Sequence, residues 1–221
     1  QKVAVGPSES MSKSKKNTID PEMIIKNFGA DAVRLFILSD SPPEKDVQWS
    51  DEGMNSSYKF IQKLWVLNQK IIQEIKNDNP KNLDNKLEKI TNRFIKNVEN
   101  NIENFSYNKI IANIHEMYTN LNKEIDNKYS KNQLIENYQK ILITMNPIIP
   151  HFTDECLEMI GIKEGIYWPQ VNNKVLVEEK EKFVVQINGK TRGVIELNKN
   201  IDENEVVLSI KNNQTLKKYI V

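Results

Sequence analysis

Apolar side chains recur every three or four positions between residues 50 and 145 of this 221-residue chain. This is the period of a helix that buries one face. Breaks around Pro80, after Phe105 and before Ser130 divide the run into four segments, each long enough for several helical turns. Long amphipathic helices joined by short connections favour an antiparallel bundle. The sequence therefore predicts a mainly α fold.

The periodicity also predicts which side chains face the core of the bundle. The first segment begins at Ser50, followed by two acidic residues that suit a helix start, and its predicted core positions are Met54, Tyr58, Ile61, Trp65, Ile72 and Ile75. The second segment contributes Leu83, Leu87, Ile90, Phe94, Val98, Ile102 and Phe105. The third, from Tyr107 to Lys128, contributes Ile110, Ile111, Ile114, Met117, Tyr118, Leu121 and Ile125. The fourth opens with a capping box of Ser130 and Gln133 and contributes Leu134, Tyr138, Ile141, Leu142 and Met145.

Shorter elements are expected on both sides of this run. Asp20 and Pro21 start a helix that stops at Gly29, a second helix covers 30–38, and a third begins at Pro150 and ends near Gly161. Near the C-terminus, alternating segments at 183–187 and 190–197 flank Asn-Gly, a pair that favours the positive φ angles of a tight hairpin turn. A helix opened by Asp202 and Glu205 follows, so we expect a small α+β unit at this end.

Composition excludes several classes of protein. The chain has 31 Lys and Arg against 30 Asp and Glu, so any contact with nucleic acid must come from local basic patches. Its apolar runs are far shorter than the roughly 18 to 20 residues of a membrane span, and the single cysteine, Cys156, cannot form an internal disulfide. We expect a cytoplasmic monomer without membrane association.

A short loop ahead of the first helix carries the clearest chemical signal. Ser12, Lys13, Ser14, Lys15 and Lys16 place hydroxyl and ammonium groups together, which suits them to oxyanions such as a triphosphate. Runs of lysine and serine are also common in solvated loops that bind nothing. The composition of the loop alone leaves both interpretations open.

The residues that follow resolve this choice by resemblance. The loop, the Asp20-Pro21 pair, a Gly-Ala-Asp at 29–31 and an Arg-Leu-Phe at 34–36 resemble the region around the KMSKS motif of class I aminoacyl-tRNA synthetases. Within that class, residues 41–53 look most like the bacterial-type leucyl enzymes. The motif is formed by Ser10, Met11, Ser12, Lys13 and Ser14, so that Ser10 replaces the family's first lysine. The resemblance implies that these five residues bind ATP and that Lys13 is catalytic through contact with the ATP phosphates.

Two further segments extend the resemblance along the chain. Residues 146–158 are similar to part of the family's helical anticodon-binding-type domain, and residues 186–193 are similar to the start of the leucyl enzymes' C-terminal domain. The resemblance implies three parts: the end of a catalytic core at 1–45, an anticodon-binding-type bundle at 46–170, and an incomplete tRNA-contacting α+β domain at 171–221. No His-x-Gly-His motif occurs, so we expect a C-terminal fragment that is inactive alone.

The implied activity is the activation of leucine by ATP with Mg²⁺ and its transfer to tRNA(Leu), with ATP and leucine bound through the rest of the catalytic core. Two alternatives stay open. One is a sister synthetase for valine, isoleucine or methionine, against which residues 42–53 argue. The other is a noncatalytic tRNA-binding scaffold built from the same bundle.

Other candidate residues have a structural and a functional interpretation. His115 and His151 lie in different predicted helices without ligand partners at metal-binding spacing, so we assign them structural roles and predict no metal site. Trp49, Trp65 and Trp168 could stack on bases, but we predict core positions for all three. Lys190 and Arg192 alternate on the predicted hairpin, where they either contact tRNA phosphates or form a solvated face.

Overall fold

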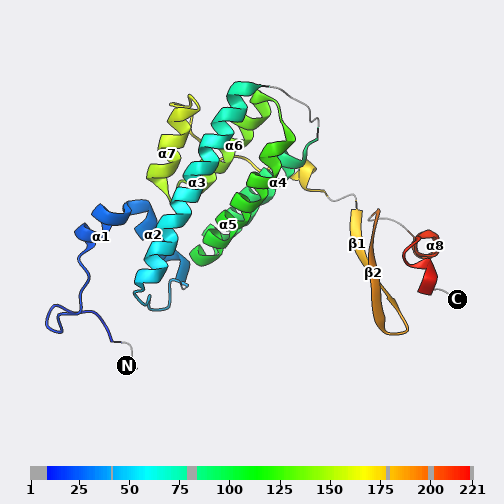
Figure 1. The fold of residues 1–221 in the computed structure, drawn as a ribbon, viewed down its shortest axis with the longest axis horizontal. Coiled ribbons are helices and arrows are strands. Elements are labelled where there is room, and N and C mark those ends of the chain that lie inside the picture. Colours follow the sequence, from blue (N-terminus) through cyan, green and yellow to red (C-terminus); the bar gives the residue numbers. More distant parts are fainter. Residues whose placement is uncertain (1–8, 41, 79–83, 178–179, 199–201, 220–221) are drawn as a thin grey trace. The chain divides into compact units, whose positions relative to one another are not determined.

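The computed structural model describes residues 9–40, 42–78, 84–177, 180–198 and 202–219. Internal contacts divide the chain into two compact units, residues 1–172 and residues 173–221. The first unit is helical and the second combines a hairpin with helices (Figure 1). The predicted mainly α fold with a small α+β part is confirmed.

Two short helices open the first unit. Helix α1, Pro21–Phe28, starts as predicted, because the Asp20 carboxylate accepts a hydrogen bond from the Glu22 backbone N–H at 3.0 Å. Gly29 ends the helix with a φ of 80°, a conformation that suits glycine, and helix α2, Ala30–Asp40, begins at the next residue. None of the side chains of α1 is fully buried.

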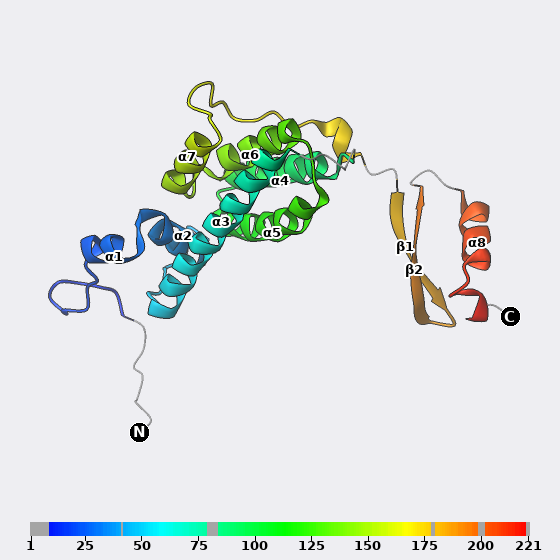
Figure 2. The ribbon, with the colours of Figure 1, turned by 45° about the horizontal axis from the view of Figure 1, so that its top comes forward.

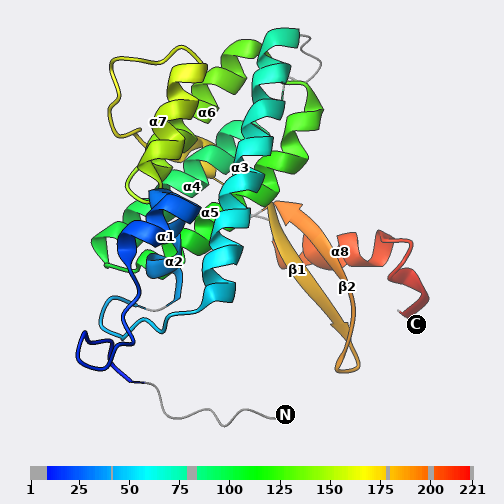
Figure 3. The ribbon, with the colours of Figure 1, turned by 60° about the vertical axis from the view of Figure 1, so that its left-hand side comes forward.

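The bundle consists of four long helices that lie side by side in all three views (Figures 1–3). They are α3, Asp51–Asn77; α4, Lys86–Glu103; α5, Tyr107–Glu124, which is extended by the 3-10 turn η1, Ile125–Asn127; and α6, Lys131–Met145. The shorter α7, Pro150–Met159, packs against α6 and α3. As predicted, Ser130 and Gln133 form a capping box at the start of α6.

Contacts between helix ends fix the direction of each helix. The end of α3 meets the start of α6, where the Lys131 backbone N–H donates to Asp78 Oδ1 at 3.0 Å. The start of α4 meets the end of α5 through an ion pair between Lys86 and Glu124. Consequently α6 runs antiparallel to α3, and α5 runs antiparallel to α4.

A continuous apolar core fills the space between these helices. Its completely enclosed side chains come from every long helix and from the turn before α7, and include Ile71, Val98, Ile110, Ile114, Ile141, Leu142 and Ile149. Burying side chains of this size contributes about 1.5 to 3 kcal/mol each, before the entropic cost of ordering the chain. This core supplies the rigid frame of the first unit.

Two predicted core positions are wrong, and one lies outside the described residues. Trp65 is 39% exposed, because the buried stripe of α3 runs through Phe60, Leu64 and Ile71, one residue away from the predicted stripe. One residue corresponds to a rotation of about 100° on a helix. Phe105 is 63% exposed, because it lies beyond the end of α4 in the turn to α5. Leu83 is not among the described residues.

The second unit is built on the predicted hairpin. Strand β1, Lys180–Ile187, pairs antiparallel with β2, Lys190–Asn198, and both turn residues between them have positive φ, 51° and 72°. The 3-10 turn η2, Asn173–Leu176, precedes the strands. Helix α8, Glu203–Asn212, and the 3-10 turn η3, Lys217–Tyr219, follow. Val185, Ile195 and Leu216 form the small core of this unit.

The hairpin contains a bulge that changes the predicted position of one arginine. Val185 pairs with Gly193 while its neighbour Gln186 pairs with Thr191, which leaves Arg192 as the extra residue of β2. The Arg192 guanidinium lies over the Tyr219 ring at 4.4 Å from its centroid. Simple alternation along β2 therefore does not describe the direction of the Arg192 side chain.

A buried carboxylate ties the ends of α4 and α5 together. Glu124 is 5% exposed, accepts hydrogen bonds from Asn127 at 2.8 Å and Tyr129 at 3.0 Å, and pairs with Lys86. Burial raises the pKa of Glu124, but the hydrogen bonds from Lys86, Asn127 and Tyr129 and the Lys86 charge outweigh burial and lower it below the ordinary value of 4.5. The cluster thus stabilises the fold fully at pH values above the ordinary pKa of 4.5. This stabilisation is lost as the pH falls through the lowered pKa of Glu124.

We predict that Glu124→Gln lowers the free energy of unfolding at neutral pH by about 1 to 3 kcal/mol, because the charged hydrogen bonds of a buried carboxylate are lost. The variant should also lose less stability than the wild type between about pH 5 and pH 3. Urea unfolding followed by helical circular dichroism across this pH range measures both effects. The matched control is Glu158→Gln, at an exposed carboxylate paired with Lys163. Parallel pH profiles for wild type and Glu124→Gln would contradict the assignment.

Candidate functional site

The serine- and lysine-rich loop forms a compact turn ahead of α1. The Lys15 backbone N–H donates to the carbonyl of Ser12 at 3.2 Å and to its hydroxyl at 3.3 Å, and the Lys16 N–H donates to the Lys13 carbonyl at 3.2 Å. Lys16 has a φ of 52°, which lets the chain reverse towards α1. Lys13 and Ser14 therefore lie at the tip of the turn.

One asparagine closes the base of this loop. Asn17 accepts a hydrogen bond from the Ser12 backbone N–H at 2.8 Å and donates to the Ser10 carbonyl at 3.3 Å. A side-chain amide that bonds backbone groups on both sides of a turn takes the place of missing backbone pairs. The loop from Ser10 to Asn17 thus holds a defined shape although it is exposed.

The lysines of the loop differ in their surroundings. The Lys15 ammonium pairs with Glu9 at 3.0 Å, a half-exposed contact of small energetic value. No hydrogen bond or ion pair joins the Lys13 ammonium to another described residue, and its side chain is exposed at the tip. Among the described loop residues, Lys13 therefore offers an ammonium group that an incoming oxyanion can use without breaking a contact, and the exposed Lys16 offers a second one. Ser10, Met11 and Ser14 are exposed beside it.

A small apolar cluster attaches α1 to the bundle. Ala32, Phe36 and Met54 form its buried centre, and Ile24 and Phe28 of α1 pack against it with partial burial. At Gly53, in the first turn of α3, a Cβ atom would lie 2.8 Å from Cε2 of Phe36, so only glycine lets the ring approach this closely. The cluster thereby places α1 and its loop beside the start of α3.

Helix α2 also makes polar contacts with the turn between α6 and α7. The Asp31 carboxylate, 7% exposed, accepts from the backbone N–H of Phe152 at 2.7 Å and lies 2.9 Å from Nδ1 of His151. One helical turn further on, Arg34 donates to the carbonyls of Pro147 at 2.7 Å and Ile148 at 2.9 Å. These contacts join segments more than 110 residues apart in the chain.

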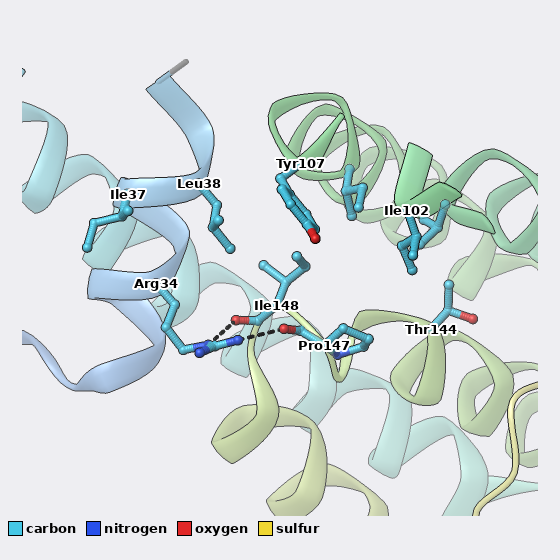
Figure 4. A pocket seen from close by; sticks show the side chains of 10 residues that line it. Arg34, Ile37, Leu38, Ile102, Tyr107, Thr144, Pro147 and Ile148 are labelled. Carbon is cyan, nitrogen blue, oxygen red and sulfur yellow. Dashed lines mark hydrogen bonds between the residues drawn. The ribbon is translucent and has the colours of Figure 1, made fainter. Parts of the chain in front are cut away.

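An apolar pocket of about 620 Å³ lies beside these contacts (Figure 4). Helix α2 supplies one wall, and α4, α5, α6 and the turn before α7 supply the rest; the lining residues are Arg34, Ile37, Leu38, Val98, Ile102, Tyr107, Ile110, Thr144, Pro147 and Ile148. The side chains of Leu38, Tyr107 and Ile148 point towards one another in this view. Packing on this side of α2 is thus incomplete.

Both histidines contact side chains of other helices. His151 lies at the start of α7 beside Asp31. The His115 ring stacks on Phe60 with centroids 3.7 Å apart, and partial burial together with the Lys63 charge lowers the pKa of His115. In the part of the chain that the structure describes, no three His, Cys, Asp or Glu side chains come together as metal ligands.

The tryptophans other than Trp65 are partly buried. Trp49 packs edge-on against Phe36 with centroids 5.3 Å apart, and its Nε1 donates to Asp51 at 2.8 Å. Trp168 packs against the bundle core and donates to Glu99 at 2.8 Å.

None of the helices among the described residues combines the length and apolar character that crossing a membrane requires.

Two family profiles match the chain in the order of its structural parts. One, described as tRNA synthetases class I (I, L, M and V), matches residues 5–50, which include the loop, α1 and α2. The other, described as the anticodon-binding domain of tRNA ligase, matches residues 84–208, more than half of the chain. The chain belongs to this anticodon-binding family. The resemblance predicted from the loop and the bundle is confirmed.

Similarity to individual relatives extends over nearly all of the chain. It is 37% identical over 211 residues to a leucine--tRNA ligase of Wolbachia pipientis from Culex pipiens (strain wPip), covering 93% of the chain and 26% of the relative. It is 38% identical over 208 residues to that of Rickettsia bellii (strain RML369-C), and 36% identical over 216 residues to that of Prochlorococcus marinus (strain MIT 9312). These two matches cover 92% and 95% of the chain. The chain spans about a quarter of the length of each relative.

A solved structure supports the fold. The chain matches a LeuRS of Agrobacterium radiobacter K84, solved in a ternary complex with tRNA and LeuAMS, with a TM-score of 0.78. The match covers 94% of this chain and 28% of the other, at 22% identity. The two chains therefore share a fold.

Sequence reasoning identified the loop but gave no role to Asn17 or Asp31. A signal for Asp31 is present in the sequence, because α7 begins with Pro150 after Ile149, which has no side chain able to cap the helix. An uncapped helix start needs an acceptor from elsewhere in the fold. Nothing in the sequence around residue 150 says that the acceptor comes from a position 120 residues earlier.

We predict that Asn17→Ala makes the loop more mobile, because both backbone contacts at its base are lost. Limited trypsin digestion at Lys13, Lys15 and Lys16 should become faster, while the bundle stays protected. Asn17→Asp is the matched control, since it keeps the acceptor for Ser12 and loses only the donor. Equal cleavage rates for Asn17→Ala and wild type would show that the asparagine does not hold the loop.

Proposed function

We propose that this chain is the part of a leucine--tRNA ligase that supplies an ATP-phosphate loop and tRNA-binding domains. The observation that carries the proposal is the exposed, unengaged ammonium of Lys13 at the tip of a closed loop, in the segment that matches class I synthetases. Relatives of that name align with 92% to 95% of the chain. The chemistry of the loop fits this role, because lysine binds phosphate as a point charge and serine hydroxyls donate to its oxygens.

In the proposed reaction, a carboxylate oxygen of leucine attacks the α-phosphorus of ATP. The bond from this phosphorus to the bridging oxygen breaks, and its electron pair leaves with pyrophosphate. Lys13, within the loop formed by Ser10, Met11, Ser12, Lys13 and Ser14, stabilises the charge that develops on the leaving pyrophosphate. A contact that strengthens as this charge develops lowers the barrier rather than only tightening binding. The ribose hydroxyl at the end of tRNA(Leu) then attacks the carbonyl carbon of the adenylate; the bond from this carbon to the phosphate oxygen breaks, AMP leaves with the electron pair, and the hydroxyl loses its proton.

Mg²⁺ enters this scheme bound to ATP. The carboxylates next to the loop are already used, since Glu9 pairs with Lys15 and Asp20 caps α1. The loop therefore fits phosphate oxygens and does not fit a resident divalent cation, which prefers a cluster of oxygen ligands. Ser10 brings no charge to the position where the family has a lysine, so the free positive charge of the loop rests with Lys13 at its tip and with the exposed Lys16.

We assign residues 1–45 to the end of the catalytic core, 46–170 to the anticodon-binding-type bundle and 171–221 to a tRNA-contacting α+β domain. Lys190, exposed beside the hairpin turn, is the better candidate for a phosphate contact, because Arg192 is directed over the Tyr219 ring. Such contacts position an RNA without reading its sequence. A cytoplasmic monomer is part of the same proposal.

We predict that the full-length protein containing this chain catalyses ATP–pyrophosphate exchange with leucine, but not with isoleucine, valine or methionine. Lys13→Ala should lower the exchange rate by about 10² to 10³, the usual effect of removing one group that stabilises transition-state charge. Lys15→Ala is the matched control, at a neighbouring lysine that is already paired, and should change the rate far less.

The possible outcomes separate the alternatives. Exchange driven by another amino acid would assign the chain to a sister synthetase, and no exchange with any of the four would favour a noncatalytic tRNA-binding scaffold. Normal leucine exchange by Lys13→Ala would leave the enzyme identified and remove the role of Lys13.

We also predict that Lys190→Ala weakens binding of tRNA(Leu) and reduces the dependence of log Kd on log salt concentration by about one. A filter-binding titration of the full-length protein at several salt concentrations measures both quantities. Lys163→Ala is the control, because this exposed lysine already pairs with Glu158. An unchanged salt slope for Lys190→Ala would exclude a phosphate contact at this position.

A further inference from the structure

The turn between α6 and α7 has both kinds of unpaired backbone group that helix ends leave. Helix α7 begins without a side-chain cap of its own, so its first N–H groups need an acceptor. The carbonyls of Pro147 and Ile148, which precede it, need donors. Helix α2 supplies both, through the Asp31 carboxylate and the Arg34 guanidinium. We call Asp31, Arg34 and the turn 147–152 the α2 clasp.

The α2 clasp fixes α2 in a directional way. Asp31 and Arg34 are three residues apart and so share one face of the helix. One of them binds donors and the other binds acceptors of the same turn, so a rotation of α2 or a slide along its axis would break both sets of hydrogen bonds. Charged groups make the stronger hydrogen bonds of a protein, and Asp31 is almost completely buried.

The apolar surroundings of α2 do not replace this constraint. The pocket of about 620 Å³ beside Leu38, Tyr107 and Ile148 leaves room on that side of the helix (Figure 4). Elsewhere on α2 the Phe36 ring packs closely on Gly53, so apolar contacts also constrain the helix there. On the side of the pocket, the clasp supplies the directional contacts.

The position of the loop depends on α2. Only Gly29 separates α1 from α2, and the loop that carries Lys13 leads directly into α1. Helix α1 has no fully buried side chain, and it packs both on α2 and on α3, where the Phe28 ring meets Tyr58 edge-on. A change at the turn between α6 and α7 can reach the loop along the α2 side of this attachment, through α2 and α1.

We infer that Asp31 and Arg34 are positioning residues that couple the helical bundle to the loop at residues 10–17. The reaction at Lys13 then depends on how the bundle is placed against α2. The inference rests on the proposed function for its effect on activity. Its structural part, the dependence of the loop on the clasp, can be measured without any reaction.

The test uses Asp31→Ala and Arg34→Ala in the full-length protein. Each should lower kcat/KM for ATP in leucine-dependent exchange by about 10- to 100-fold, since small displacements of a catalytic group have effects of this size. The KM for leucine should stay unchanged. Amide hydrogen exchange at residues 10–28 should become faster, while exchange in the interior of α5 stays as in the wild type.

Three further variants separate positioning from loss of stability. Tyr138→Phe removes a buried hydrogen bond to Asn68 inside the bundle without touching α2, and should change neither the ATP parameters nor exchange at residues 10–28. Arg34→Lys keeps one donor and should recover part of the activity. Asp31→Ala combined with Lys13→Ala should lose less than the product of the two single effects, because both act on the same step.

The outcomes distinguish failure of the clasp from failure of the proposed function. Unchanged amide hydrogen exchange at residues 10–28 in both alanine variants overturns the inference, whatever the enzymatic activity of these variants. Amide hydrogen exchange in the loop could become faster while the losses of activity of the two single variants multiply in the double variant. This result would also overturn the inference, because the clasp would then act independently of Lys13. If the wild type shows no leucine-dependent activity, the proposed function fails, and hydrogen exchange alone decides whether the clasp controls the loop.

Discussion

Polar groups of the backbone and of side chains at the ends of packed helices must find partners, and much of this structure follows from how they do so. The end of α3 and the start of α6 are joined by Asp78, the end of α5 and the start of α4 by Glu124 with Lys86, and the start of α7 is completed by Asp31. Apolar burial makes the helices associate, but it does not specify their directions. The polar contacts at the ends convert an apolar cluster into one bundle with a fixed order of helices.

The balance between apolar burial and polar contacts also separates the rigid parts of the first unit from the adaptable parts. The bundle has a continuous core, whereas the loop at 10–17 depends on a single asparagine and on short-range turns. Residues that close over a ligand belong to the low-stability end of a fold, because they must move in order to bind and release it. The exposed loop at residues 10–17 leads into a helix that is incompletely buried, so few contacts restrain it. The rigid bundle supports that helix from one side.

Much of the fold could be predicted from the sequence, because the signals were local. The caps at Asp20 and Asp202, the capping box at Ser130 and the Asn-Gly turn each involve residues within a few positions of one another. The errors arose where two helix faces are both apolar, as around Trp65, or where a bulge shifts the alternation, as at Arg192. Contacts such as that of Asp31 with Phe152 depend on the packed fold, so local patterns did not reveal them. The roles of Lys13 and Lys190 remain predictions.

The glycine at position 53 shows what close packing against α2 requires of the helix beside it. Glycine is about 1 kcal/mol less favourable than alanine inside a helix, yet it occupies the first turn of α3 because the Phe36 ring leaves no space for a methyl group. The chain gives up intrinsic helix propensity at this one residue in exchange for an aromatic contact with a different helix. Substitution of Gly53 is consequently restricted by the ring of Phe36 on α2 and not by the helix propensities that act within α3.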